Sequence, residues 1–308
     1  MKEIPVGATV AHAYRFAFFD FPKILGRIWL PAVIMSVAGI YPLRQLINIF
    51  EALSTDDFAS ALHQAWILVP FLILGFILYC SQIASIVQLA LQPSRQQVLY
   101  HFSVGKPVWR LIGAFLFAFL VYLVAWLASL LAGILVSVIF YPFVTAANLR
   151  IALTITSLVA GVLVYGAFIS VTVRPVFLMA PVAIAEQKIS MTRAWSLSRG
   201  NFWRLILVFV AVFLPFWLIQ RLLLVAFLPS NIMLSAPPGA SQEVKAAVLA
   251  NLMNWAAQML GTMLHYWYIA YPLGLLWMGI YLGAIFGAQT FAYQALAQEE
   301  ASVPVAAD

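Results

Sequence analysis

Six long stretches of this sequence are almost free of charged side chains, and they constrain the fold more than any other feature. A transmembrane helix needs about 20 mainly apolar residues to cross a hydrocarbon core of about 30 Å. Each stretch is longer than that and holds at most two Asp, Glu, Lys or Arg residues. They cover residues 27–49, 64–91, 108–140, 152–174, 203–228 and 263–294. The sequence therefore predicts an all-α fold, a polytopic transmembrane helical bundle of six spans in a single membrane domain, 1–308.

The overall composition excludes several classes of function. Hydrophobic residues make up 65% of the chain and charged residues 8%, whereas a soluble domain has about 45–50% apolar and about 25% charged residues. A soluble enzyme, a nucleic-acid binder and a secreted module are therefore excluded for the chain as a whole. Cys80 is the only cysteine, so no disulfide can form within the chain.

The basic residues predict the orientation of the spans. One predicted side holds eleven of them: Lys2, Arg15, Lys23, Arg27, Arg95, Lys106, Arg110, Lys188, Arg193, Arg199 and Arg204. The opposite side holds four: Arg44, Arg150, Arg221 and Lys245. Since loops rich in Lys and Arg stay in the cytoplasm, we expect both termini on the cytoplasmic side of a bacterial inner membrane.

A helix is also expected just before the last span. Val244, Val248, Leu252, Trp255 and Met259 fall on one helical face, whereas Asn251, Asn254 and Gln258 lie off it. This pattern predicts an interfacial helix over 244–260, with Ser241 as its N-cap.

The chain resembles itself in three places. Residues 13–25 match 194–206 without a gap, and a weaker copy lies at 100–112. Chance matches between apolar hairpins are the alternative explanation. The copies predict pseudo-repeats over about 6–92, 94–185 and 188–295 and a short cytoplasmic tail over 296–308, each repeat with an amphipathic cytoplasmic helix and a transmembrane hairpin. The basic and aromatic residues between helix and hairpin are predicted lipid-headgroup anchors: Lys23, Trp109, Arg110, Trp203 and Arg204.

Small residues predict where helices approach closely. The last span carries Gly279, Gly283 and Gly287 at intervals of four, and such stripes let two backbones come together in lipid. We expect this stripe to pack inside the monomer. A dimer face is the alternative and would make the protein a homo-oligomer.

Charged and titratable residues give little indication of catalysis. Arg174 ends the fourth span, and we favour a structural pair with Glu186 over a substrate or proton-relay role. His63, His265, Asp56 and Asp57 could form an acid–base or metal cluster, but the neighbouring Trp and Tyr residues favour an aromatic belt. No catalytic residue, metal site or cofactor is therefore predicted.

One segment resembles a known group of membrane proteins. Arg174, Pro181 and Glu186 are followed by Ala194, Gly200, Trp203 and Arg204. This order resembles that in bacterial proteins related to the membrane domain of glycerophosphoryl diester phosphodiesterases and in YciC-like inner-membrane proteins. The match covers about 30 residues, and Trp195 and Ser196 depart from the usual pattern. The resemblance implies a membrane domain alone, because the phosphodiesterase activity belongs to a separate soluble domain.

Two functions remain open at this stage. The first is a non-enzymatic protein of the cytoplasmic membrane that organises the envelope by contacting membrane lipids, anionic ones included, or a protein partner, and that binds no nucleic acid. The alternative is a small permease or transporter subunit for a lipid-like or small solute. A permease would need a cavity at membrane depth lined by Arg174, Gln82, Gln88 or Gln289.

Overall fold

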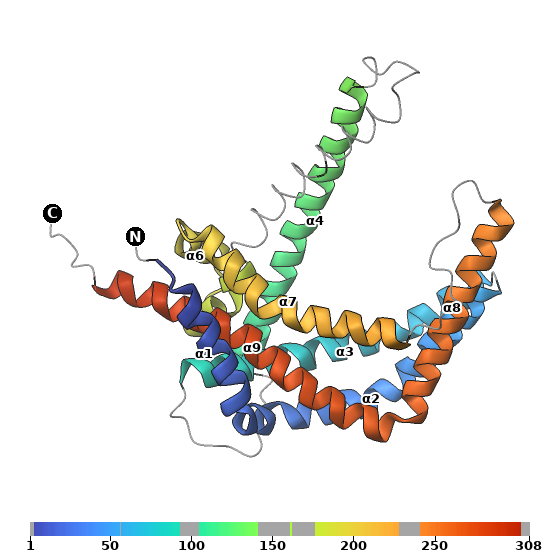
Figure 1. Cartoon of the computed structure of the whole chain (residues 1–308), viewed down its shortest axis with the longest axis horizontal. Helices are drawn as coiled ribbons and strands as arrows, with labels where there is room; N and C mark the ends of the chain where they lie inside the picture. Colours follow the sequence, from blue (N-terminus) through green and yellow to red (C-terminus); the bar gives the residue numbers. More distant parts are fainter. Residues whose placement is uncertain are drawn as a thin grey trace.

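The computed structural model describes residues 3–55, 57–92, 105–140, 161, 176–227 and 241–302. Within these residues every regular element is a helix (Figure 1), which confirms the all-α prediction. The helices are α1 (Val6–Phe19), α2 (Phe21–Ser54), α3 (Phe58–Leu91), α4 (Lys106–Phe140), the short apolar helix Val176–Ala185, α6 (Met191–Ser198), α7 (Phe202–Phe227), α8 (Gln242–His265) and α9 (Trp267–Ser302).

Five of these helices are long and apolar enough to cross a membrane: α2, α3, α4, α7 and α9. They coincide with five of the six predicted spans. The remaining one, 152–174, lies outside the described residues, and so does Arg174. Three of these helices, α2, α4 and α7, begin at one end of the molecule, and α3 and α9 terminate there. We call this end the α1 side.

Local sequence explains where several helices begin. Asp20 separates α1 from α2, and Pro22 lies in the first turn of α2, where its missing N–H removes no helical hydrogen bond. The Asp57 side chain accepts a hydrogen bond from Ser60 N at 3.1 Å and caps α3. Ser241 accepts one from Val244 N at 3.3 Å, which confirms the predicted cap of α8.

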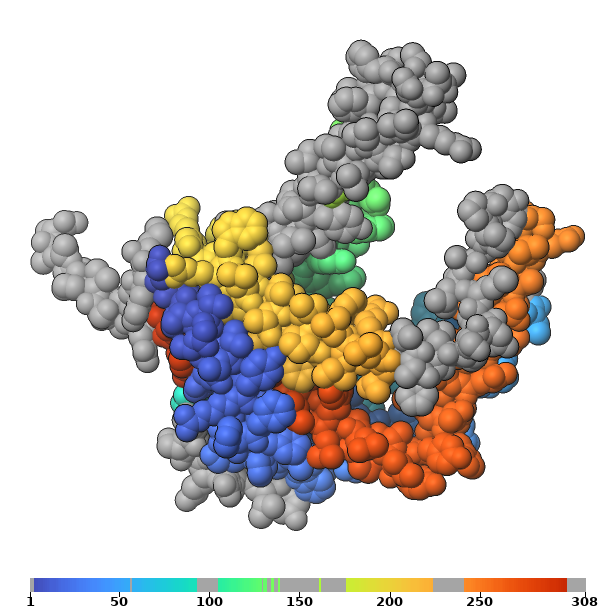
Figure 2. All heavy atoms as spheres, in the orientation of Figure 1, coloured from blue at the N-terminus to red at the C-terminus, as the bar shows by residue number. Residues whose placement is uncertain are grey.

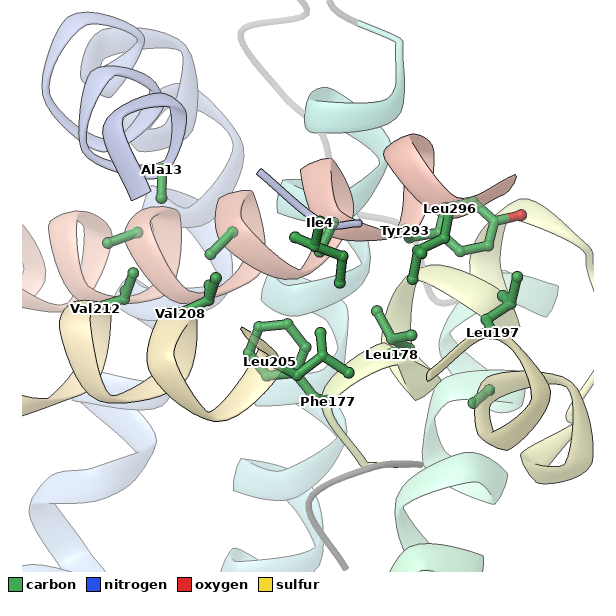
Figure 3. Close-up of a cluster of buried hydrophobic side chains, with 14 of the residues drawn as sticks. Ile4, Ala13, Phe177, Leu178, Leu197, Leu205, Val208, Val212, Tyr293 and Leu296 are labelled. Atoms are coloured by element: carbon green, nitrogen blue, oxygen red, sulfur yellow. The ribbon is translucent and has the colours of Figure 1, made fainter. Parts of the chain in front are cut away.

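The buried core lies mainly on the α1 side. One cluster joins α1, the helix Val176–Ala185, α6, α7 and α9, with Ile4 inserted among them (Figure 3). A second cluster joins α2, α3 and α9 to the first turns of α4. Beyond those turns α4 points away from the other helices (Figure 1).

The last predicted span differs from the structure at its start. The prediction begins it at residue 263, but α8 continues to His265 and α9 begins at Trp267. α8 packs along α2 and is longer than the predicted helix 244–260. At the other end α9 continues to Ser302, beyond the predicted start of the tail at 296.

The first and third predicted repeats share local features. Asp20 separates α1 from α2, and Asn201, its counterpart, directly precedes α7. Four aligned pairs of residues are buried in both copies: Ala13 and Ala194, Phe16 and Leu197, Ala17 and Ser198, Ile24 and Leu205. The second copy lies partly outside the described residues, so the threefold repeat stays a prediction.

Candidate lipid-contact surface

Glu186 is the centre of a junction between the end of the helix Val176–Ala185, α6 and α9. Its Oε1 accepts a hydrogen bond from Arg193 Nε at 2.9 Å, within an ion pair, and another from Tyr293 Oη at 3.3 Å. The next residue, Gln187, has φ of 55°, a left-handed conformation that reverses the chain direction. This reversal brings α6 back toward Glu186.

A second junction ties the start of the chain to α7. Ile4 N donates to Asn201 Oδ1 at 3.0 Å, and Arg204 forms an ion pair with Glu3. Gly200 precedes Asn201 with φ of 80°, a conformation that glycine adopts without steric cost. Several residues that carry the family resemblance therefore help to hold the fold together on the α1 side, and Ala194 and Pro181 are buried beside them.

The predicted headgroup anchors divide into two groups. Lys23 Nζ lies 2.5 Å from Asp20 Oδ1, and Arg204 pairs with Glu3, so both cations are neutralised within the protein. Trp109 at the start of α4 and Trp203 at the start of α7 are 56% and 73% exposed. Arg110 is half-buried beside Trp109, and no carboxylate of the described residues pairs with it.

Further aromatic and basic side chains are exposed on the α1 side. Trp195 of α6 is 36% exposed, and Phe18 and Phe19 end α1 with most of their surface uncovered. The exposed cations of this side without a carboxylate partner among the described residues are Arg15, Lys106, Lys188 and Arg199. Figure 2 shows α1 in blue beside α6 and the start of α7 in yellow.

The glycine stripe of α9 lies against α1 and α2. A Cβ built on Gly279 would lie 3.0 Å from Phe21 Cε2, and one on Gly287 would lie 2.8 Å from Phe16 Cδ1. Gly283 is the most enclosed, because its Cβ would lie 2.8 Å from Ile24 Cδ1 and 3.3 Å from Ala17 Cα. These contacts are within the monomer.

A cavity of about 410 Å³ separates α2 from the α8–α9 elbow. The described lining comprises six residues of α2, between Ala32 and Leu43, and eight residues of α8 and α9, between Met263 and Met278. None of these fourteen residues is charged. Ser36 and Tyr271 contribute the hydroxyl groups of the lining. The described lining is therefore mainly apolar and comes from α2, α9 and the end of α8.

The histidine and aspartate cluster considered from the sequence has no metal-binding arrangement within the described residues. No group of three or more His, Cys, Asp and Glu side chains there could hold a metal ion. Asp57 caps α3, and its hydrogen bonds from Ser60 lower the pKa of its carboxyl group. His265 packs edge-on against Tyr266, with ring centroids 4.7 Å apart. Asp56 lies outside the described residues.

Sequence reasoning missed several partners at the two junctions. Arg193 pairs with Glu186, and Tyr293 joins them from α9. The predicted pair of Arg174 with Glu186 stays a prediction, because Arg174 lies outside the described residues. Glu3 and Asn201 were not singled out either. The match between Asp20 and Asn201 in the repeat was the available signal for Asn201, because both residues stand between consecutive helices.

Comparisons with protein-family models, with curated proteins and with solved structures find no match to this chain. A proposal for the function therefore rests on the arrangement of the residues of this chain.

Proposed function

We propose that this chain is an integral protein of the bacterial cytoplasmic membrane that binds anionic lipid headgroups through its α1 side, which faces the cytoplasm, and has no enzymatic role. The observation that carries the proposal is the group of exposed tryptophans on that side beside cations that pair with no carboxylate of the described residues. Tryptophan concentrates at the membrane–water interface because its ring is apolar and its N–H is polar.

The first turns of α4 provide the clearest example. Lys106, Trp109 and Arg110 follow one another within five residues at the point where the helix enters its apolar stretch. Trp109 is 56% exposed, so the ring can lie among headgroups while the cations meet lipid phosphates. A basic residue near an anionic membrane surface contributes about 1 kcal/mol to binding.

The end of α6 and the start of α7 repeat this combination. Arg199 is exposed between the two helices, and Trp203 in the first turn of α7 is 73% exposed. Arg204 beside it is bound to Glu3, so we assign Arg204 to the fold and Arg199 to lipid. By the same reasoning Lys23, which pairs with Asp20, serves the fold.

The proposal is tested by comparing two sets of glutamine variants. The triple variant Lys106→Gln, Arg110→Gln and Arg199→Gln should lose up to about 100-fold in affinity for phosphatidylglycerol, from about 1 kcal/mol for each charge. Native mass spectrometry of the protein released from mixed-lipid nanodiscs measures the retained lipid. Retention of phosphatidylethanolamine should stay unchanged, because it has no net charge.

The matched control removes the two paired cations through Lys23→Gln and Arg204→Gln. It should retain phosphatidylglycerol like the wild type. Unchanged retention in the triple variant, or an equal loss in the control, would contradict the proposal.

The resemblance to the membrane domain of glycerophosphoryl diester phosphodiesterases and to YciC-like proteins is kept as a proposal. It agrees with a membrane part that acts without a catalytic domain. The described residues that carry it, Glu186 and Gly200 among them, lie at the two junctions of the α1 side.

The permease alternative receives no support from the described residues. Gln82 and Gln289 are buried, and neither these two nor Gln88 lines the cavity between α2 and α9. Gln82 Nε2 instead contacts Met35 Sδ at 3.3 Å.

A further inference from the structure

The helices α2 and α9 pack closely at one end of their contact and leave space between them farther along. On the α1 side the helices touch closely, with Gly279 of α9 facing Ile28 and Gly283 facing Ile24 of α2. The two helices are antiparallel, so moving from Gly283 to Gly279 on α9 corresponds to moving from Ile24 to Ile28 on α2. Continued in this register, residues 264–275 of α8 and α9 face residues 32–43 of α2, which is where the cavity lies.

The two glycines in this second half have space beside them. A Cβ built on Gly39 of α2 or on Gly274 of α9 would meet no atom within 4 Å, and both residues line the cavity. The close contact of the glycine stripe with α2 thus ends at Gly279. Farther from the α1 side there is space between α2 and α9.

We propose that this cavity is a binding site for one acyl chain of a membrane lipid, in the middle of the hydrocarbon core. Its volume of about 410 Å³ lies in the range of about 300–1,000 Å³ typical of ligand sites. Space of this size between helices in a bilayer is filled by the medium, and at this depth the medium is hydrocarbon.

The length of the cavity fits an acyl chain. The lining of α2 extends from Ala32 to Leu43, a rise of about 16 Å at 1.5 Å per residue. The lining of α9 from Trp267 to Met278 has the same length. About 16 Å is roughly half of a hydrocarbon core of about 30 Å, a length that one acyl chain can cover.

The lining also fits the chemistry of an acyl chain. None of its fourteen described residues is charged. Three are methionines, Met35, Met263 and Met278, whose flexible side chains adapt to an apolar ligand of irregular shape. This site is far from the headgroup surface on the α1 side and does not depend on it.

Photo-crosslinking tests the site in reconstituted vesicles. The probe is a phosphatidylcholine with a diazirine on one acyl chain, a lipid without net charge, so that the result is independent of anionic headgroup binding. Peptide mass spectrometry compares labelling of the cavity lining, 32–43 and 267–278, with labelling of the exposed α4 residues 116–127, which meet bulk lipid.

In the wild type the cavity lining should be labelled at least about threefold more than α4. Gly39→Leu and Gly274→Leu each place a side chain in the cavity from opposite helices and should reduce this ratio to about one. Gly75→Leu is the matched control, because Gly75 also has no atom within 4 Å of a built Cβ but does not line the cavity.

Equal labelling of the lining and α4 in the wild type would overturn the proposal, and so would a ratio that both leucine variants leave unchanged. A variant that fails to fold is replaced by the alanine change at the same glycine, which should reduce the ratio in the same direction.

Discussion

His12, on the α1 side, makes a packing contact that depends on the protonation state of its ring. Its ring stacks on Phe291 of α9, with centroids 4.3 Å apart and 19° between the planes. Burial lowers the pKa of His12 below the ordinary value of 6.5, and the positive charge of Arg15 lowers it further, while Asp20 acts in the opposite direction. The folded protein therefore resists protonation of this ring.

The pH dependence follows from that shift. Because the unfolded chain binds the proton at a higher pH than the folded protein, the stabilisation from neutral His12 is complete above about pH 6.5 and declines as the pH falls below it. His12→Phe keeps a ring for the contact with Phe291 and removes the titration. Thermal unfolding in detergent micelles from pH 7.5 to 5 should show a smaller decrease in midpoint for the variant than for the wild type. Equal decreases would contradict this role of His12.

Residue-level partners were the least predictable part of the site. The sequence favoured Arg174 as the partner of Glu186, because Arg174 ends the fourth span and the apolar linker before Glu186 could fold back toward it. The described partner is Arg193, and the contact depends on the left-handed Gln187 and on the position of α6. Glutamine carries no sequence signal for a positive φ, so this reversal could not be read from residue types.

At the scale of helices, the contact of α9 with α1 and α2 depends on the glycine stripe. Small residues allow helix backbones to approach in lipid, where no hydrophobic effect drives helices together. Gly283 is the tightest point, since one of its neighbours is the backbone atom Ala17 Cα, at 3.3 Å from a built Cβ. A flexible side-chain end can move aside, whereas a helix backbone cannot do so cheaply.

Gly283→Val should therefore destabilise the protein by about 1–3 kcal/mol, the usual cost of overpacking a core. Gly261→Val is the matched control, because Gly261 of α8 has no atom within 4 Å of a built Cβ. This control should leave stability unchanged or raise it slightly, since glycine is a poor helix former. Thermal unfolding midpoints in the same micelles measure the difference. Equal midpoints for the two variants would show that the stripe is not a close contact.

Elements were more predictable than residue partners, for a physical reason. The hydrocarbon core imposes a minimum length of apolar sequence, and this requirement located α2, α3, α4, α7 and α9. The break between α8 and α9 at Tyr266 was predicted a few residues too early, between 260 and 263, because no charge, glycine or proline marks Tyr266 itself. The amphipathic helix predicted at the start of the first repeat is α1, and its residues Ala13 and Ala17 are buried against the rest of the protein.

At the scale of the whole molecule, the protein has two parts. On the α1 side, two junctions and the main core hold the helices together, and exposed tryptophans and cations surround them. Farther from α1, near the middle of α2, the helices α2 and α9 separate around an apolar cavity. The central claim is that the α1 side lies at the level of the lipid headgroups, with the helices beyond it in hydrocarbon.

Nitroxide depth measurement tests this claim most directly. Cys80, the only cysteine, is replaced by alanine, and single cysteines are introduced at Trp109, Trp203, Gly39 and Leu120 for spin labelling in vesicles. Accessibility to oxygen and to a water-soluble nickel complex should place labels at 109 and 203 at headgroup depth and labels at 39 and 120 in the hydrocarbon core. Two results would contradict the account. One is that labels at 109 and 203 lie as deep as those at 39 and 120. The other is that labels at 109 and 203 are as accessible to nickel as in free solution.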